Sequence, residues 1–280
     1  FPTGVNDDGT ATVDYAYWIA ETEVTYELWN KVYVWATSYT IDHDGDGTID
    51  HEDVYHFAHA GAQGYNGGIQ HPVTMVDWRD SMVWCNALTE WYNAQNGTSY
   101  ECVYTYSSAI IRDSRESNAA ACDGAVVSST AKGFRLLTSA EWEYAARYRN
   151  GTLWTYGDHA SGDESGACYN DGSILGGMRL SAVFGNYAWW DGNSGSSTHV
   201  VGTAGNGGGA ACTGNSNALG LYDMSGNVWE WNFDCIGSDR VVRGGNCWTS
   251  AGGVQVGVWD YYNPNDESSD AGFRFARSAP

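Results

Sequence analysis

The chain has 280 residues, 42% of them hydrophobic and 14% aromatic, which is enough to build a large core and argues against disorder. Its formal net charge of -21 excludes nucleic acid and anionic lipid as favoured partners, because an acidic surface repels phosphate groups. No transmembrane segment is expected, since no stretch reaches the apolar length that spans a bilayer. Residues 1–5 lack the basic start and apolar run of a signal peptide, so we expect any leader to have been removed.

The N-terminal segment predicts a strand followed by a helix. Residues 13–19 mix aromatic, apolar and small side chains in rough alternation, as a half-buried strand does. Thr25 is suited to cap a helix, because its hydroxyl can accept a free backbone N–H of the first turn. Trp29 and Val32 then give that helix an apolar face.

Two further helices are predicted from their starts. Asp77 is a good N-cap, and apolar residues recur at helical spacing across residues 78–92. Thr138 and Glu141 form the pattern of a capping box, in which each side chain accepts the backbone N–H of the other residue.

The second half of the chain is predicted to be irregular. From about residue 150 the helical periodicity fades, and short strands are expected at 240–243 and 272–277. Few helices with many loops and short strands predict an α+β domain. No linker divides the chain, so residues 1–280 are expected to form a single domain.

Seven cysteines occur without CxxC pairs or the ligand spacing of a zinc site. They are Cys85, Cys102, Cys122, Cys168, Cys212, Cys235 and Cys247. Because the number is odd, at least one thiol stays free in a monomer, and buried thiols with one or two disulfides are the simplest interpretation.

Six motifs occur in order over nearly the whole chain. They are AETEVT (20–25), HPV with VDW (71–78), RLLTSAEWEYAA (135–146), GLYDMSGNVWEW (220–231), RGG (243–245) and GFR (272–274). Together they resemble the formylglycine-generating-enzyme, or sulfatase-modifying-factor, family, and an ordered set is far more specific than any single motif. The resemblance implies a C-type-lectin-like fold, which is α+β with much irregular structure and has its termini close together.

The resemblance also implies where a catalytic site would lie. The family's enzyme oxidises a substrate cysteine with copper held by two cysteine thiolates, which lie five residues apart shortly after the RGG motif. The matching positions are Thr249 and Val254, which supply no thiolate, and Cys247 alone cannot make a two-sulfur site. We therefore expect no copper and no catalysis, with an oxidase that uses another site as the alternative.

Residues 246–271, which we call the cassette, depart from the family although the motifs on both sides fit it. The cassette is NCWTSAGGVQVGVWDYYNPNDESSDA and contains no Lys, Arg, Leu, Ile, Phe, Met or His. This contrast resembles the variable proteins of diversity-generating retroelements, the Treponema type among them, whose C-terminal cassette is rewritten at adenines, often in AAC codons. Most cassette residues belong to the set that a mutated AAC codon encodes, whereas Gln255, Glu267 and the two tryptophans do not.

The composition of the cassette suits recognition, because Tyr and Trp give contact area at little entropic cost while Ser, Gly and Asn adapt their hydrogen bonds. We predict that it binds an unknown ligand, a protein or a surface molecule. The predicted anchors are Trp248, Trp259, Tyr261 and Tyr262. The predicted polar contacts are Thr249, Ser250, Asp260, Asn265, Asp266, Glu267, Ser268, Ser269 and Asp270, with Cys247 beside them. A core position is an equal alternative for Trp248 and Val256, because strands flank the loop.

Residues 42–53 resemble an EF-hand calcium loop that is inserted into the family framework. Oxygen-bearing residues fall at the ligand positions of such a loop, and Gly47 falls where the loop must turn sharply. The predicted ligands are Asp42, Asp44, Asp46, Thr48, Asp50 and Asp53. Asp53 stands where an EF-hand has Glu, and a solvated acidic hairpin is the alternative.

A second calcium site is implied by the family resemblance alone. In the family enzymes, calcium is held around the Gly-Asn-x-Trp-Glu-Trp motif by side chains and backbone carbonyls. The matching positions are Asp223, Gly226, Val228 and Glu230, and a local pairing of Glu230 is the alternative.

The sequence thus predicts a non-catalytic ligand-binding protein, of the receptor or adhesin kind, that is secreted or held at the cell surface and contains structural calcium. A sulfatase-modifying-factor-like oxidase is one alternative. A carbohydrate-binding lectin is another, although the chain lacks the Glu-Pro-Asn and Gln-Pro-Asp motifs of calcium-dependent sugar binding.

Overall fold

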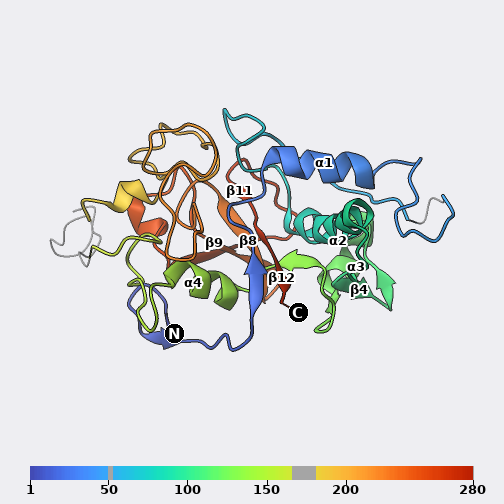
Figure 1. The fold of residues 1–280 in the computed structure, drawn as a ribbon, viewed down its shortest axis with the longest axis horizontal. Helices are drawn as coiled ribbons and strands as arrows, with labels where there is room; N and C mark the ends of the chain where they lie inside the picture. Colours follow the sequence, from blue (N-terminus) through green and yellow to red (C-terminus); the bar gives the residue numbers. More distant parts are fainter. Residues whose placement is uncertain (50–52, 166–180, 280) are drawn as a thin grey trace.

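The computed structural model describes residues 1–49, 53–165 and 181–279, and Figure 1 shows their arrangement. The α-helices are α1 (Tyr26–Ala36), α2 (Trp78–Asn96), α3 (Ala119–Asp123) and α4 (Ser139–Arg147). The first seven strands are β1 (Pro2–Thr3), β2 (Gly9–Thr10), β3 (Tyr17–Ile19), β4 (Tyr104–Tyr106), β5 (Ala109–Ile110), β6 (Val126–Val127) and β7 (Phe134–Leu136). The last five are β8 (Trp229–Ile236), β9 (Asp239–Arg243), β10 (Trp259–Tyr262), β11 (Ala271–Gly272) and β12 (Phe275–Ser278).

The three predicted helix starts are confirmed, because each depends on a local hydrogen bond. The Thr25 hydroxyl accepts the backbone N–H of Leu28 at the start of α1. Asp77 caps α2, and Thr138 with Glu141 forms the predicted capping box of α4.

The predicted strands are confirmed less evenly. The expected strand at 13–19 is reduced to β3, whereas β9 covers the expected strand at 240–243. The segment at 272–277 is split into β11 and β12, because Phe273 and Arg274 between them turn their side chains into the interior, where both are fully buried.

Two sheets organise the centre of the domain. One has the strand order β10-β9-β8-β11 and the other has the order β3-β12-β7. In the second sheet, β3 near the N-terminus pairs antiparallel with β12 near the C-terminus. Both ends of the chain therefore lie on the same side of the molecule, as the family resemblance predicts (Figure 1).

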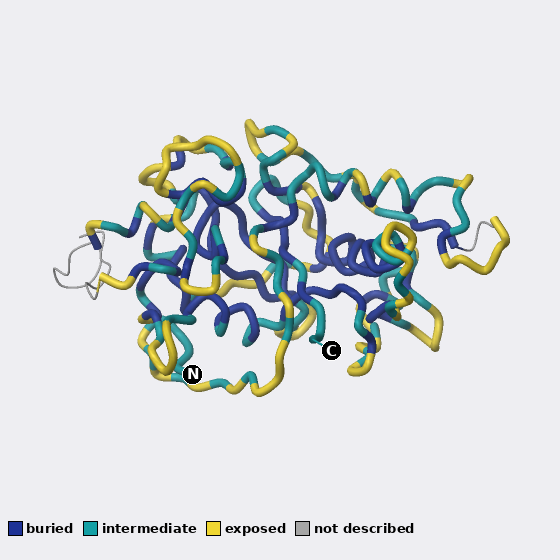
Figure 2. Tube along the Cα trace, in the orientation of Figure 1, coloured by how far each residue is buried: buried dark blue, intermediate teal, exposed yellow. Residues whose placement is uncertain are grey.

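The main core lies between α1, α2 and these sheets. Helix α2 is buried from Trp78 to Glu90, and it appears as a dark coil inside the trace in Figure 2. The rings of Trp29 and Trp84 are stacked with centroids 5.7 Å apart, and Phe273 contacts both rings edge-on. These buried indoles supply much of the apolar area that holds the helices on the sheets.

The disulfides expected from the sequence are not formed among the cysteines that the structure describes. All six of these are free thiols, and Cys168 lies outside the described residues. Within the described part of the chain, none of the helices has the length and the apolar character that crossing a membrane requires.

Candidate functional site

The cassette reaches both edges of the four-stranded sheet. It leaves β9, forms the edge strand β10 and ends in β11. Because side chains alternate along a strand, Trp259 and Tyr261 share one face, where 47% and 49% of their surfaces are exposed. Tyr262 faces inward, with its ring 5.8 Å from that of Trp231. The strand therefore presents two aromatic side chains to solvent and is fixed to the core by a third.

A hollow of about 310 Å³ lies next to β10 and is lined by cassette residues alone. The lining residues are Tyr262, Asp266, Glu267, Ser268 and Asp270. Burial raises the pKa of the Tyr262 hydroxyl, and the nearby Asp270, Asp260 and Asp266 raise it further, so that this hydroxyl stays neutral. The hollow thus combines a neutral phenol with carboxylates and favours positive or hydrogen-bond-donating groups.

Several predicted contact residues also stabilise the shape of the cassette. The Asn246 amide donates to an Asp270 carboxylate oxygen over 2.6 Å, and the Ser268 hydroxyl donates to the other oxygen. The Thr249 hydroxyl donates to Oδ1 of the Asn246 side chain over 2.8 Å. Trp248 is half-buried, with its ring edge-on to Tyr65 at 4.9 Å. The hydrogen bonds of Asn246 and Asp270 link the two ends of the cassette to each other, and Trp248 packs the cassette against the framework.

The remaining predicted contacts divide by burial. Ser250, Asp260, Asn265, Asp266 and Glu267 are exposed, and Ser269 is half-buried. The placement of Cys247 at the binding surface is wrong, because its side chain is fully buried. Burial also raises the pKa of this thiol to about 12, which leaves it protonated and weakly nucleophilic.

Thr249 and Val254, which the family resemblance matches to the copper-thiolate positions, have different surroundings. Thr249 makes the hydrogen bond to Asn246, and Val254 is fully buried in a small apolar cluster with Ala251 and Phe184. Val256 is also fully buried, so it is a core residue and not part of the exposed surface. This part of the cassette is therefore packed against the core and supports the exposed residues that follow it.

The structure adds His59, which the sequence did not single out. Its Nδ1 donates to Asp80 Oδ2 over 2.7 Å, and its Nε2 lies 3.6 Å from Glu267 Oε2 in the cassette. The hydrogen bond to Asp80 raises the pKa of His59, and the negative charges of Asp77 and Glu267 add to the effect. No sequence pattern predicts the contact with Glu267, because it joins His59 to a residue more than two hundred positions away.

The predicted EF-hand-like loop is formed in part. Carboxylate oxygens of Asp42, Asp44 and Asp46 lie within 4.8 Å of one another. Asp42 accepts the backbone N–H groups of Gly45 and Gly47, and these hydrogen bonds lower its pKa. Both glycines have positive φ, which the sharp turn requires.

Other predicted ligands of this loop are not in that cluster. The Thr48 backbone N–H donates to Asp46 Oδ1 over 2.7 Å, and Asp50 lies outside the described residues. Asp53 is not brought to the three carboxylates but lies 4.0 Å from the Arg112 guanidinium. Asp53 therefore does not fit its predicted role as the twelfth-position ligand in this structure.

The second predicted calcium site contains an ion pair of Glu230, which is the alternative to a metal role, although its partner Arg274 is distant in sequence. Both carboxylate oxygens of Glu230 accept hydrogen bonds from Arg274 over 2.6 to 2.9 Å, and Trp142 Nε1 donates to one of them over 2.7 Å. Glu230 and Arg274 are both fully buried. The predicted role of Glu230 as a metal ligand is corrected accordingly, because its carboxylate already has a cationic partner.

Two other carboxylates at this place keep an unpaired oxygen. Asp223 Oδ1 and Glu23 Oε2 are buried and have no hydrogen-bond partner among the described residues. Burial raises the pKa of Asp223 to about 6, and burial with the charge of Asp223 raises the pKa of Glu23. These orphaned oxygens fit a divalent cation, to which the predicted carbonyls of Gly226 and Val228 would add neutral ligands. Glu23 lies in the first family motif, and the sequence offered no reason to connect it with Asp223.

The order of helices and short strands, with much irregular structure between them, defines an α+β domain of the formylglycine-generating-enzyme type. A family model described as "Sulfatase-modifying factor enzyme 1-like domain" matches residues 7–279, and the chain belongs to this family.

Solved structures and a curated protein show the same relationship. Treponema denticola variable protein 1 is 28% identical with a TM-score of 0.65, and the match covers 100% of this chain and 92% of that one. The structure of CarF is 26% identical with a TM-score of 0.65, over 94% of this chain and 87% of that one. Chaperone protein LppX of Paenibacillus barcinonensis is 27% identical over 226 residues, which cover 75% of this chain and 71% of that protein. The predicted fold and the predicted resemblance to a variable protein are both confirmed.

Proposed function

We propose that this protein is a non-catalytic receptor or adhesin that uses the cassette, residues 246–271, to bind a ligand outside the cell. The observation that carries the proposal is the division of the cassette into two sets of side chains. Val254 and Val256 are fully buried, whereas Trp259 and Tyr261 are exposed beside a hollow that only cassette residues line. Exposed aromatic anchors next to adaptable polar groups are the usual composition of a diversified binding surface.

The similarity to Treponema denticola variable protein 1 supports this proposal, because that protein is by name a variable one and the match covers the whole of this chain. Diversification of the cassette belongs to the proposal. A protein or another surface molecule is the favoured ligand, since an exposed edge with a shallow acidic hollow suits a broad partner, while the net charge of -21 disfavours nucleic acid. Secretion or surface display is part of the same proposal.

An experiment with a displayed library tests the proposal. We would randomise the exposed positions Ser250, Asp260, Asn265 and Asp266, and select clones against a panel of purified proteins. Clones should stay folded and yield binders, because these side chains do not support the core. Widespread unfolding of the clones, or selection without any binder, would count against a recognition surface.

Matched substitutions locate the binding energy in the selected clones. Trp259→Ala with Tyr261→Ala should weaken binding at least about tenfold, because exposed aromatic anchors are frequent hot spots. Trp18→Ala with Tyr106→Ala is the control, since these two aromatic residues are similarly exposed, at 60% and 42%, but lie outside the cassette. Equal losses in both double variants would show that the cassette is not the site.

We also propose that calcium is structural at two places, the Asp42–Asp44–Asp46 cluster and the Asp223–Glu23 site. Calcium titration of Asp44→Asn should show a loss of affinity of about tenfold at one site, because affinity depends on the charge of the ligand set. Asp223→Asn should affect a separate site, and the exposed Asp8→Asn serves as the control. Unchanged titration curves for both variants would refute calcium at these positions.

A further inference from the structure

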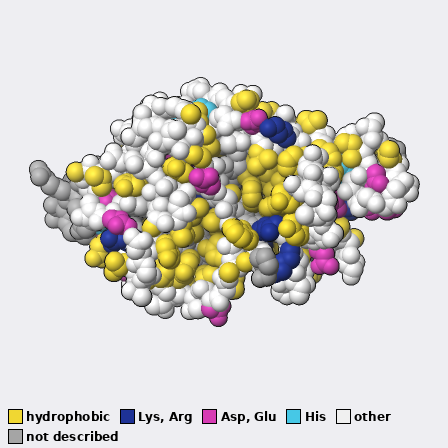
Figure 3. Space-filling view, in the orientation of Figure 1, with side chains coloured by type: hydrophobic (Ala, Val, Ile, Leu, Met, Phe, Trp, Pro, Cys, Tyr) yellow, Lys and Arg dark blue, Asp and Glu magenta, His cyan; other side chains and the backbone are white. Residues whose placement is uncertain are grey.

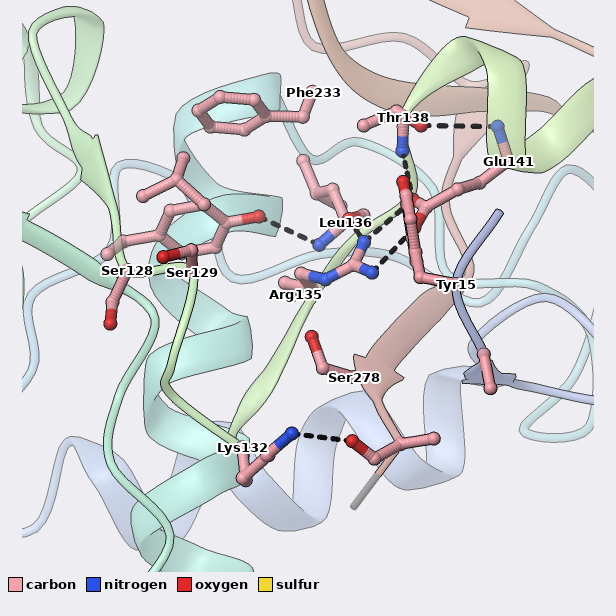
Figure 4. Close-up of a pocket in the computed structure, with 14 residues that line it drawn as sticks. Tyr15, Ser128, Ser129, Lys132, Arg135, Leu136, Thr138, Glu141, Phe233 and Ser278 are labelled. Atoms are coloured by element: carbon pink, nitrogen blue, oxygen red, sulfur yellow. Dashed lines mark hydrogen bonds and ion pairs between the residues drawn. The ribbon is translucent and has the colours of Figure 1, made fainter. Parts of the chain in front are cut away.

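A cavity of about 490 Å³ lies apart from the cassette, between β7, the start of α4 and the loop that follows β6 (Figure 4). None of its lining residues belongs to residues 246–271 or to the two carboxylate clusters. Its volume lies within the range of small-molecule sites, which is about 300 to 1,000 Å³. The proposed binding function makes no use of this cavity.

The inner wall of the cavity is apolar and held in place. Phe233 stacks on Tyr104 with ring centroids 5.3 Å apart, and Leu136 lines the cavity beside them. The Tyr104 hydroxyl accepts the Leu136 backbone N–H over 2.9 Å, so its polar end is satisfied inside the fold. Tyr104 and Leu136 are themselves almost fully buried, so the apolar surface open to a ligand is that of the half-buried Phe233 and of the exposed Tyr15 and Val127.

Among the described residues that line the cavity, one charged group stays without a counter-charge. Arg135 is neutralised by Glu141, which accepts two hydrogen bonds from the guanidinium over 2.6 and 2.7 Å. Lys132, by contrast, donates to the neutral carbonyl of Ala279 over 2.5 Å and makes no ion pair with any residue that the structure describes. Figure 4 shows the paired Arg135 and, across the cavity, the ammonium group of Lys132.

This positive group is unusual for the chain as a whole. The protein has a formal net charge of -21, and Lys132 is one of only two lysines, the other being Lys31. Lys31 is exposed and paired with Glu27 over 2.7 Å. Ser129, which is exposed and lines the same cavity, adds a hydroxyl that can donate to an anion.

We infer that this cavity binds a small organic anion. The aromatic or aliphatic body of the ligand lies against Phe233, Tyr15 and Val127, and its carboxylate or sulfonate pairs with Lys132. The apolar wall supplies affinity through buried area, and the ammonium group selects for the negative charge. The site is independent of ligand binding by the cassette.

A pair of fluorescent probes tests the inference. Anilinonaphthalene sulfonate and phenylnaphthylamine share one apolar body, and only the first carries a negative charge. The sulfonate should bind the intact chain at one site, and Lys132→Ala should weaken it about tenfold, because a charge-assisted hydrogen bond contributes about 1.5–3 kcal/mol. The neutral probe should bind more weakly and respond little to the same substitution.

Three variants separate this cavity from other apolar surfaces. Lys31→Ala should leave both probes unaffected, and Lys132→Arg should restore most of the sulfonate affinity. Ser129→Trp should abolish binding by filling the cavity. Trp18→Ala should have no effect, although Trp18 lines two neighbouring hollows of about 630 and 290 Å³.

A measurement on the unmodified protein covers the case in which a variant does not fold. The sulfonate probe should protect Lys132, but not Lys31, from an amine-acylating reagent, as read by mass spectrometry. Equal protection of the two lysines, equal affinity for the two probes, or unchanged sulfonate binding by folded Lys132→Ala would each overturn the inference.

Discussion

Replacing Glu230 by glutamine is expected to destabilise the protein by about 3–5 kcal/mol, because it leaves the guanidinium of Arg274 buried without its counter-charge. Both side chains are fully buried, and the carboxylate accepts hydrogen bonds from Arg274 and from Trp142 Nε1. This pair joins β8 to the segment between β11 and β12, so that its loss would loosen the end of the chain from the sheet.

Urea unfolding of the variant and the parent measures this cost. Glu27→Gln is the matched control, because Glu27 makes an exposed, solvent-screened pair with Lys31 and its loss should leave the free energy of unfolding nearly unchanged. The experiment is repeated with calcium and with a chelator. A loss that occurs only when calcium is present would mean that Glu230 is a metal ligand after all, against the role assigned to it here.

The second large effect is expected inside the cassette, where neighbouring positions should respond in opposite ways. Val254→Asp should destabilise the protein by more than about 4 kcal/mol, because it buries an unpaired charge in an apolar cluster. Trp259→Ala and Tyr261→Ala should each change stability by no more than about 0.5 kcal/mol, since roughly half of each side chain is in solvent.

Thermal unfolding of the three variants tests this division, with Val126→Asp as a control for the introduced charge. Val126 is 60% exposed, so the same substitution there should have little effect. If Val254→Asp were tolerated as well as Val126→Asp, the cassette would not contain the buried support that separates framework from recognition surface. A large drop in the unfolding temperature of Trp259→Ala would mean that the exposed aromatic residues stabilise the fold instead.

The features that the sequence predicted well are those determined by neighbouring residues. The helix caps at Thr25, Asp77 and Thr138 depend on hydrogen bonds within three or four positions, and all three are confirmed. Strand β3 is shorter than predicted, because its length depends on pairing with β12 at the other end of the chain. Most of the second half has no periodic pattern, so its course could not be derived from local rules.

The sequence predicted the candidate binding and metal sites about as well as it predicted the fold. Tyr261 is exposed, as its predicted role as an anchor requires, but the composition of the cassette could not show that Tyr262 faces inward or that Cys247 is buried. The Glu230–Arg274 pair and the convergence of Glu23 with Asp223 join segments that are 44 or more positions apart. Such contacts depend on the fold, which the family resemblance supplied only in outline.

Apolar side chains gather over the middle of the face drawn in Figure 3, where β3 lies in Figure 1. Trp18 and Tyr15 are 60% and 52% exposed there. This patch is a further reason to include Trp18→Ala as a control in the binding experiments, because an exposed aromatic surface can bind ligands non-specifically.

The most direct test of the central claim is to sequence the DNA that flanks the gene. If the cassette is a diversified recognition surface, a near-copy of the segment encoding residues 246–277 should lie beside a reverse transcriptase gene and differ only at adenines. The differing codons should include those of exposed residues such as Asp260, Tyr261 and Asn265. The absence of such a copy, or differences spread over all four bases and over buried positions, would contradict the claim.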